Sequence, residues 1–310
     1  MKNIYSVKSL FLLMLVLATG GSAIAQQDVL YSQYLYNGLA INPAYAGSRG
    51  SVSGILLYRQ QWVGIDGAPT SINGSLHSPL LNDKFAIGIN FSNQKVGVLS
   101  QTHLNAIGAY RIKIQKGTLS MGLQATYQQA TGDFASVNTA QANDPSFSER
   151  QTFNYPNFGT GIYYFNKNFF AGFSVPNILN HNLYVAGADS GNKSQLIRHY
   201  FATAGGVFRI NEDFQFKPSG MVRLAANSPV QADINGTIIY QDFLMGGVSL
   251  RNFDALAASV QVFLGKQWWL GYAHDWSTNG FNAYNNGTHE IFIGFDYFFR
   301  KPQILTPRYF

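Results

Sequence analysis

Cysteine is absent from the 310 residues, so no disulfide framework stabilises this chain. Charged residues are also scarce: they make up 12% of the sequence, roughly half the share in globular proteins. The net charge of +6 comes from scattered residues without Lys/Arg runs, which argues against nucleic-acid binding. After residue 25 no stretch approaches the roughly eighteen consecutive apolar residues of a membrane-spanning helix. These absences exclude a disulfide-rich secreted domain and a helical membrane protein.

The first residues instead carry an export pattern. Lys2 and Lys8 flank a short polar stretch, an apolar run covers residues 10–17, and Ala23 to Ala25 provides small residues for cleavage. This predicts a signal peptide over residues 1–25, cleaved between Ala25 and Gln26. The apolar run is too short for an anchor, and no cysteine follows the cleavage site for a lipid.

Aromatic residues and a period of two dominate the rest of the chain. Aromatics reach 15%, and glycine occurs 31 times. Between residues 104 and 114, Leu104, Tyr110 and Ile112 fall on one face of an extended strand and Asn105 and Arg111 on the other. Low charge, many aromatics and this alternation are typical of strands with one face toward lipid.

The alternating segments predict an all-β fold, a transmembrane antiparallel β-barrel of about fourteen strands, with twelve to sixteen as the range. An even number closes the sheet and leaves no unpaired edge in lipid. The predicted strands are Ser51–Trp62, Thr70–Ser78, Phe85–Ser92, Thr102–Ile114, Thr118–Gln128, Asn157–Phe165, Phe169–Val175, His199–Ile210, Phe214–Ala225, Val230–Tyr240, Phe243–Arg251, Ala255–Leu264, Trp268–Asp275 and His289–Phe299.

Connection lengths assign sides to this barrel, which covers residues 51–299. Short turns such as 115–117 alternate with long connections such as 130–156, and barrels of this kind keep short turns in the periplasm and longer loops outside. Loop 63–69 is therefore expected outside, and the N-terminal segment 26–50 and the tail 300–310 in the periplasm. A soluble β-sandwich or propeller shows the same alternation, but no repeat occurs here and strands of about ten residues favour the membrane barrel.

No constellation of residues indicates catalysis or a cofactor. The six histidines lie in separate segments without paired spacing, which argues against a metal site. His274 and His289 each precede a carboxylate, but neighbours on a strand point to opposite faces. No G-x-S-x-G elbow, phosphate-binding loop or dinucleotide fingerprint occurs. We therefore expect no enzyme, no metal and no cofactor, and a barrel hydrolase stays only as a distant alternative.

Two segments do not behave as plain strands. The first is tyrosine-rich, covers residues 31–47 and is broken by Asn42 and Pro43. It is either a linker with a turn or a periplasmic plug or docking element, because tyrosine provides contact area at low entropic cost. The second, residues 59–70, has Trp62 followed by a glycine-rich turn, as an aromatic-belt residue and loop would.

These segments together resemble the PorP/SprF family of type IX secretion and gliding-motility proteins of Bacteroidota. The resemblance rests on residues 31–34, 41–48, 59–69 and 75–80, and more weakly on residues 287–291 and 307–310. Val29 stands where such proteins often carry proline, a minor departure. The signature residues, expected to bind partners or to be structural, are Tyr31, Ser32, Gln33, Tyr34, Asn42, Pro43, Ala44, Tyr45, Gly47, Gln61, Trp62, Gly64, Asp66, Gly67 and Pro69.

The resemblance implies a non-enzymatic, integral outer-membrane barrel that assists secretion or surface attachment of partner proteins. Its implied partners are outer-membrane lipid, a secreted cargo adhesin with a C-terminal sorting domain, and a periplasmic lipoprotein or other type IX components. The alternative function is a transport channel for hydrophobic or small polar solutes, with residues 26–50 as a luminal plug, because a fourteen-stranded barrel has an interior that must be filled or conduct.

Overall fold

The computed structural model describes residues 34, 36–80, 83–136, 150–183, 194–226, 228–252, 254–278 and 280–298. The expected signal peptide, Tyr31, Ser32, Gln33 and the C-terminal tail lie outside these ranges. Within them strands are the main elements, and the helices are short 3-10 helices. No helix in this part of the chain is long and apolar enough to cross a membrane.

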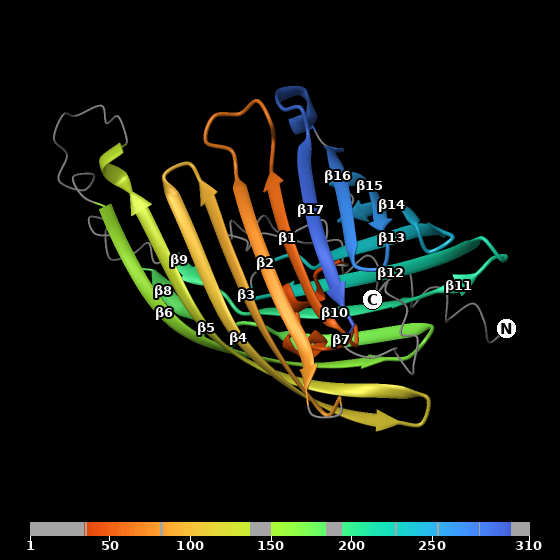
Figure 1. Cartoon of the computed structure of the whole chain (residues 1–310). Coiled ribbons are helices and arrows are strands. Elements are labelled where there is room, and N and C mark those ends of the chain that lie inside the picture. The colour runs from red at the N-terminus through yellow and green to blue at the C-terminus, as the bar shows by residue number, and fades with distance from the viewer. Residues whose placement is uncertain are drawn as a thin grey trace, which may run out of the picture.

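Fourteen antiparallel strands form one closed ring (Figure 1). The ring closes where Val52 pairs with Tyr297 and where His199 pairs with Ala225. The predicted fourteen-stranded barrel is therefore confirmed. Its strands are β1 (Val52–Gln60), β2 (Thr70–Leu80), β3 (Phe85–Val96), β4 (Leu99–Ile114), β5 (Gly117–Asp133), β6 (Arg150–Phe165), β7 (Phe169–Val175), β10 (His199–Gly206), β12 (Phe214–Ala225), β13 (Gln231–Tyr240), β14 (Leu244–Arg251), β15 (Ala255–Leu264), β16 (Trp268–Ser277) and β17 (Thr288–Tyr297).

Three shorter strands accompany the ring. β8 (His181–Leu183) and β9 (Ser194–Leu196) pair with each other in a separate two-stranded sheet. β11 (Phe208–Arg209) pairs with β12 beyond the end of β10.

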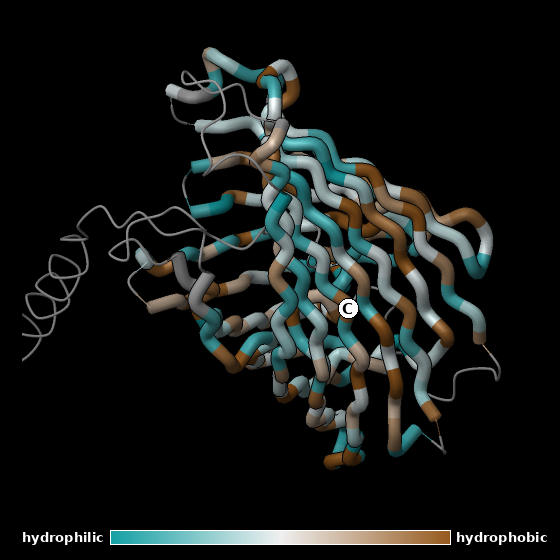
Figure 2. Tube along the Cα trace, turned by 90° about the vertical axis from the view of Figure 1, so that its left-hand side faces the viewer, coloured by the Kyte–Doolittle hydropathy of each residue, from teal (hydrophilic) through white to brown (hydrophobic). Residues whose placement is uncertain are grey.

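The alternation of side chains gives the barrel an apolar outside and a largely polar inside. On β4, Leu104 is 50% exposed, whereas its neighbour Asn105 is 7% exposed. Ile87 and Ile89 on β3 are exposed in the same way. Figure 2 shows hydrophobic residues at neighbouring positions on adjacent strands, alternating with hydrophilic ones along each strand. Because lipid accepts only apolar side chains, this outer face is the membrane-facing one.

The loop between β1 and β2 lies beside the η5 helix (Gly280–Tyr284), which connects β16 to β17, at one end of the barrel (Figure 1). We call this the long-loop end. It also contains a short connection, because residues 97–98 alone join β3 to β4. The strand ends predicted at Ser92 and Thr102 are therefore wrong. Residues 93–101 are mostly polar and lose the alternation, yet the strands stay paired, and Asn93 Nδ2 donates to Thr102 Oγ1 at 2.8 Å.

Residues 36–50, directly before β1, lie inside the ring (Figure 1). We call residues 36–50 the inner segment; it contains the 3-10 helices η1 (Gly38–Ala40) and η2 (Pro43–Tyr45). η2 packs against β4, β5 and β6, and Leu39, Ala44 and Ala46 are almost completely buried. The inner segment therefore lies in the lumen, packed against the barrel wall.

Candidate functional site in the barrel lumen

The local fold of the inner segment follows from its sequence. Asn42 caps η2: its Oδ1 accepts the backbone N–H of Ala44 at 2.9 Å, and Pro43 occupies the first helical position. Gly47 has a φ of 71°, in the left-handed region that favours glycine. The Asn-Pro-Ala-Tyr-Ala-Gly motif therefore encodes one capped turn with a defined exit.

Glycines on the lumen wall make room for this turn. A Cβ atom on Gly122 of β5 would overlap the backbone of Pro43 and Ala44. A Cβ on Gly161 of β6 would overlap the Asn42 side chain. A side chain at Gly122 would meet backbone, and one at Gly161 would displace the Asn42 amide, so the barrel wall is shaped for the inner segment.

Hydrogen bonds join the inner segment to strands far away in the sequence. Asn42 Nδ2 donates to the carbonyl of Ile162 on β6 at 3.0 Å. Ser174 Oγ on β7 donates to the carbonyl of Ile41 at 2.6 Å. Tyr34, two residues before the inner segment, is held in the same way: its hydroxyl accepts a hydrogen bond from Asn235 Nδ2 on β13 at 2.7 Å. Burial raises the pKa of Tyr34 above its usual range, so this hydroxyl stays neutral.

Tyr45 and Gly47 dock on His77. The Tyr45 ring meets the rings of His77 and Tyr163 edge-on, each at a centroid distance of 5.5 Å. The Gly47 N–H donates to His77 Nδ1 at 3.1 Å. Two sequence motifs, around residues 41–48 and 75–80, are thus the two sides of one contact.

Arg49 ends the inner segment with a buried ion pair. Its Nε and Nη2 atoms donate to Oδ1 and Oδ2 of Asp296 on β17 at 3.0 and 2.9 Å. The guanidinium also lies 5.4 Å from the centre of the Trp269 ring. Burial alone would lower the pKa of Arg49, but the Asp296 carboxylate and Tyr45 outweigh it and raise this pKa. The pair is charged and holds the segment against the seam between β17 and β1.

A second ion network lines the lumen wall near the same seam. Arg59 on β1 contacts Glu290 on β17 at 2.8 Å and Asp275 on β16 at 3.0 Å. Arg251 on β14 reaches Asp275 at 3.6 Å and Asp233 on β13 at 3.5 Å. Since Glu290 is fully buried and Arg59 is 2% exposed, breaking either pair would strand a charge in the wall.

The signature residues that the structure describes fall into two groups. Tyr34, Asn42, Pro43, Ala44, Tyr45 and Gly47 come together in the lumen. Gln61, Trp62, Gly64, Asp66, Gly67 and Pro69 instead lie in the loop between β1 and β2 at the long-loop end.

Backbone hydrogen bonds tie this loop to its neighbours. The Gln61 N–H donates to the Pro69 carbonyl at 2.9 Å and closes the loop at its base. The Val63 N–H donates to the Gly287 carbonyl at 2.9 Å, and the Gly97 N–H to the Gly67 carbonyl at 2.8 Å. Loop 61–69 is therefore bound to the connections on both sides of it, while Gly64, Asp66 and Gly67 stay exposed.

The sequence interpretation missed Arg49, Asp296 and the wall glycines as parts of the site. One signal was present: Asp296 is the one carboxylate in residues 291–299, an otherwise apolar and aromatic run, where a charge needs a partner. Among the described residues, no group of three or more His, Cys, Asp or Glu side chains is arranged to hold a metal ion.

Comparison with known proteins agrees with this architecture. Residues 23–295 match the family model of the type IX secretion system membrane protein PorP/SprF. No curated protein sequence matches the chain. Among solved structures, a FadL homologue of Pseudomonas aeruginosa is 11% identical with a TM-score of 0.50, over 90% of this chain and 96% of that one. The outer membrane protein Omp33 of Acinetobacter baumannii is 8% identical with a TM-score of 0.47, over 80% and 99%. At such identities the likeness shows the barrel fold alone.

Proposed function

Because this chain belongs to the PorP/SprF family of type IX secretion system membrane proteins, we propose that it is a non-enzymatic outer-membrane barrel that helps secrete cargo proteins or attach them to the cell surface. The long-loop end receives the cargo adhesin through loops such as 61–69. The opposite end contacts a periplasmic lipoprotein or other components of the secretion system.

The observation that carries the proposal is the inner segment in the lumen. Asn42, Tyr45 and Arg49 are held by hydrogen bonds, ring contacts and an ion pair to strands around the barrel. A lumen filled in this way is poorly suited to passing solutes. It suits a barrel that presents loops to protein partners, because a closed ladder leaves the loops free to vary.

An orientation with both chain ends in the periplasm follows from the same proposal. β1 begins and β17 ends at the end of the barrel opposite the loop between β1 and β2 (Figure 1). Long loops face outward in single-chain bacterial barrels, and short turns face the periplasm. This arrangement supports an outward-facing loop 61–69 that is available to secreted cargo.

Gene deletion with complementation tests the role. Deleting the gene is expected to abolish surface display of a specific large adhesin, and the wild-type gene should restore it. A gene with residues 63–69 replaced by a Gly/Ser linker should not restore it, whereas the same replacement of the short turn 115–116 should. Unchanged display in the deletion strain would refute the proposed function.

A transport channel is the competing function, favoured by the polar lining of the lumen. Purified protein in planar bilayers, with and without residues 26–50, separates the two. The proposed function expects no conductance from the full mature chain. Solute-dependent conductance from that chain would favour the channel, and its absence from both forms would remove the channel.

A further inference from the structure

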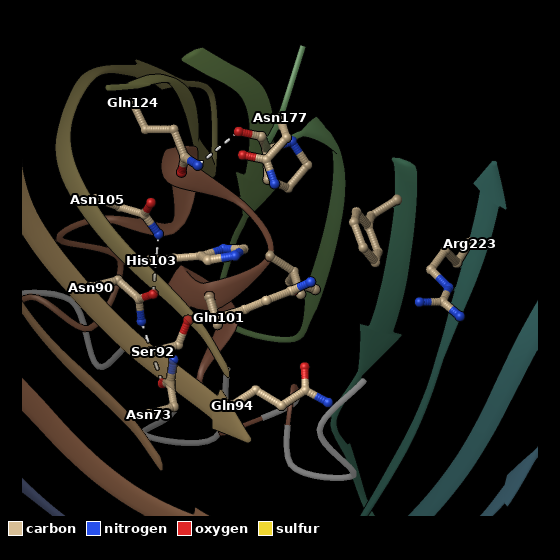
Figure 3. A pocket seen from close by; sticks show the side chains of 14 residues that line it. Asn73, Asn90, Ser92, Gln94, Gln101, His103, Asn105, Gln124, Asn177 and Arg223 are labelled. Carbon is tan, nitrogen blue, oxygen red and sulfur yellow. Dashed lines mark hydrogen bonds between the residues drawn. The ribbon is translucent and has the colours of Figure 1, made fainter. Parts of the chain in front are cut away.

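A polar cavity lies between the inner segment and the long-loop end. We call it the vestibule. Ala40 and Ile41 of the inner segment border it, and side chains of β2, β3, β4 and β5 form much of its wall (Figure 3). It encloses about 90 Å³, room for roughly six to nine water molecules at about 10–15 Å³ each.

A row of asparagines crosses three neighbouring strands on one wall of the vestibule. Asn105 Nδ2 on β4 donates to Asn90 Oδ1 on β3 at 3.2 Å, and Asn90 Nδ2 donates to Asn73 Oδ1 on β2 at 3.3 Å. Asn37 of the inner segment donates to the same Asn73 oxygen. The row is therefore fixed in position by the inner segment at one end.

Asn105 ends the row with an acceptor that has no partner. The residue is 7% exposed, and its Oδ1 atom is buried without a hydrogen bond. Asn177, which also lines the vestibule, has a buried Oδ1 atom in the same condition. Buried acceptors are normally paired, since an unpaired one is destabilising. Two of them belong to side chains that line one cavity, which suits a ligand with hydrogen-bond donors.

We propose that the vestibule binds one sugar residue of a glycan. Amide side chains both donate and accept, as the hydroxyl groups of a sugar do. The described lining residues include neither Asp nor Glu, and Phe201 contributes an aromatic ring to the lining. Arg223 and His103 face the cavity as well (Figure 3). The volume and the many hydrogen-bonding groups together suit a compact, polyhydroxylated ring.

A peptide is the less suitable ligand. Extended peptides commonly bind by adding a strand to an open sheet edge or by filling apolar pockets. The vestibule wall offers no open edge, because each of β2, β3, β4 and β5 is paired on both sides. Its apolar lining is limited to Ala40, Ile41, Pro176 and Phe201. The glycan site does not rest on the role in type IX secretion.

The site is tested by binding of labelled, detergent-solubilised mature protein to a glycan microarray. Calorimetry then measures the affinity for the free saccharide that binds best. Asn105→Leu is expected to weaken binding at least tenfold, because it removes the unpaired acceptor. Asn93→Leu on β3 is the matched control, since Asn93 does not line the vestibule, and should change binding less than twofold. If Asn105→Leu does not fold, the double substitution Gln94→Ala/Gln101→Ala at the vestibule rim replaces it.

Further arms distinguish the source of the sugar and the class of ligand. Binding of free saccharides and of lipopolysaccharide freed of its lipid supports the site. Binding only of intact lipopolysaccharide would mean contact with the lipid outside the barrel, and would overturn it. So would binding of a peptide library in place of the glycans, no glycan binding by the wild-type protein, or equal binding by wild-type and vestibule variants.

Discussion

Gly122→Ala is expected to release the inner segment without opening the barrel. Gly122 belongs to β5, and the added Cβ would overlap the backbone of Pro43 and Ala44, which has no flexible side chain to give way. Overpacking of this kind costs about 1–3 kcal/mol. That cost corresponds to an increase of about 5- to 150-fold in the population of molecules with a displaced inner segment.

Cysteine labelling measures this displacement. The chain has no cysteine, so Ser48→Cys provides one thiol in the inner segment, and Ser48 is 4% exposed. When local opening is fast, the rate of maleimide labelling follows the open population. When Gly122→Ala is added to Ser48→Cys, the rate of maleimide labelling should therefore rise by about 5- to 150-fold.

Gly108→Ala is the matched control. Gly108 lies on the neighbouring strand β4, where an added Cβ would meet nothing within 4 Å. It should leave the labelling rate unchanged, and both variants should keep the mobility of a closed barrel in unheated SDS gels. Equal labelling rates in the two variants would refute the assignment of Gly122 as the space into which the inner segment fits.

Other variants test the buried charge, the cap and the lipid face. Asp296→Ala should lower the free energy of unfolding in urea by about 3–5 kcal/mol, because it leaves the buried Arg49 guanidinium without its carboxylate. Adding Arg49→Met should recover part of this loss. If the losses of the two single variants simply add in the double variant, the pairing is contradicted. Asn42→Ala should cost about 1 kcal/mol through its cap and accelerate labelling of Ser48→Cys; unchanged labelling would argue against the cap. Leu123 is 68% exposed on the outer face, so Leu123→Arg should cost about 2–4 kcal/mol in lipid bilayers but little in detergent; equal losses in both would contradict a lipid-facing position.

The alternation of apolar and polar residues predicted the barrel, because contact with lipid determines the polarity of each strand residue one by one. Leu104 and Asn105 are neighbours in sequence, and the membrane alone dictates which of them is apolar. The strand ends near Ser92 and Thr102 could not be predicted in this way. Where β3 and β4 extend beyond the lipid, both of their faces can be polar. The two strands therefore stay paired there although the alternation of apolar and polar residues has ended.

The motif around residues 41–48 was recognisable in the sequence, and the cap by Asn42 is a local property of it. Its place in the lumen is not local. The groups that hold the inner segment, Gly122, Ile162 and Asp296, are brought to it only when fourteen strands close with one register. Before the barrel closes, nothing in the sequence specifies which strands will contact the motif. The sequence alone therefore determined a barrel preceded by a tyrosine-rich segment. The tertiary structure decided that the inner segment lies inside this barrel.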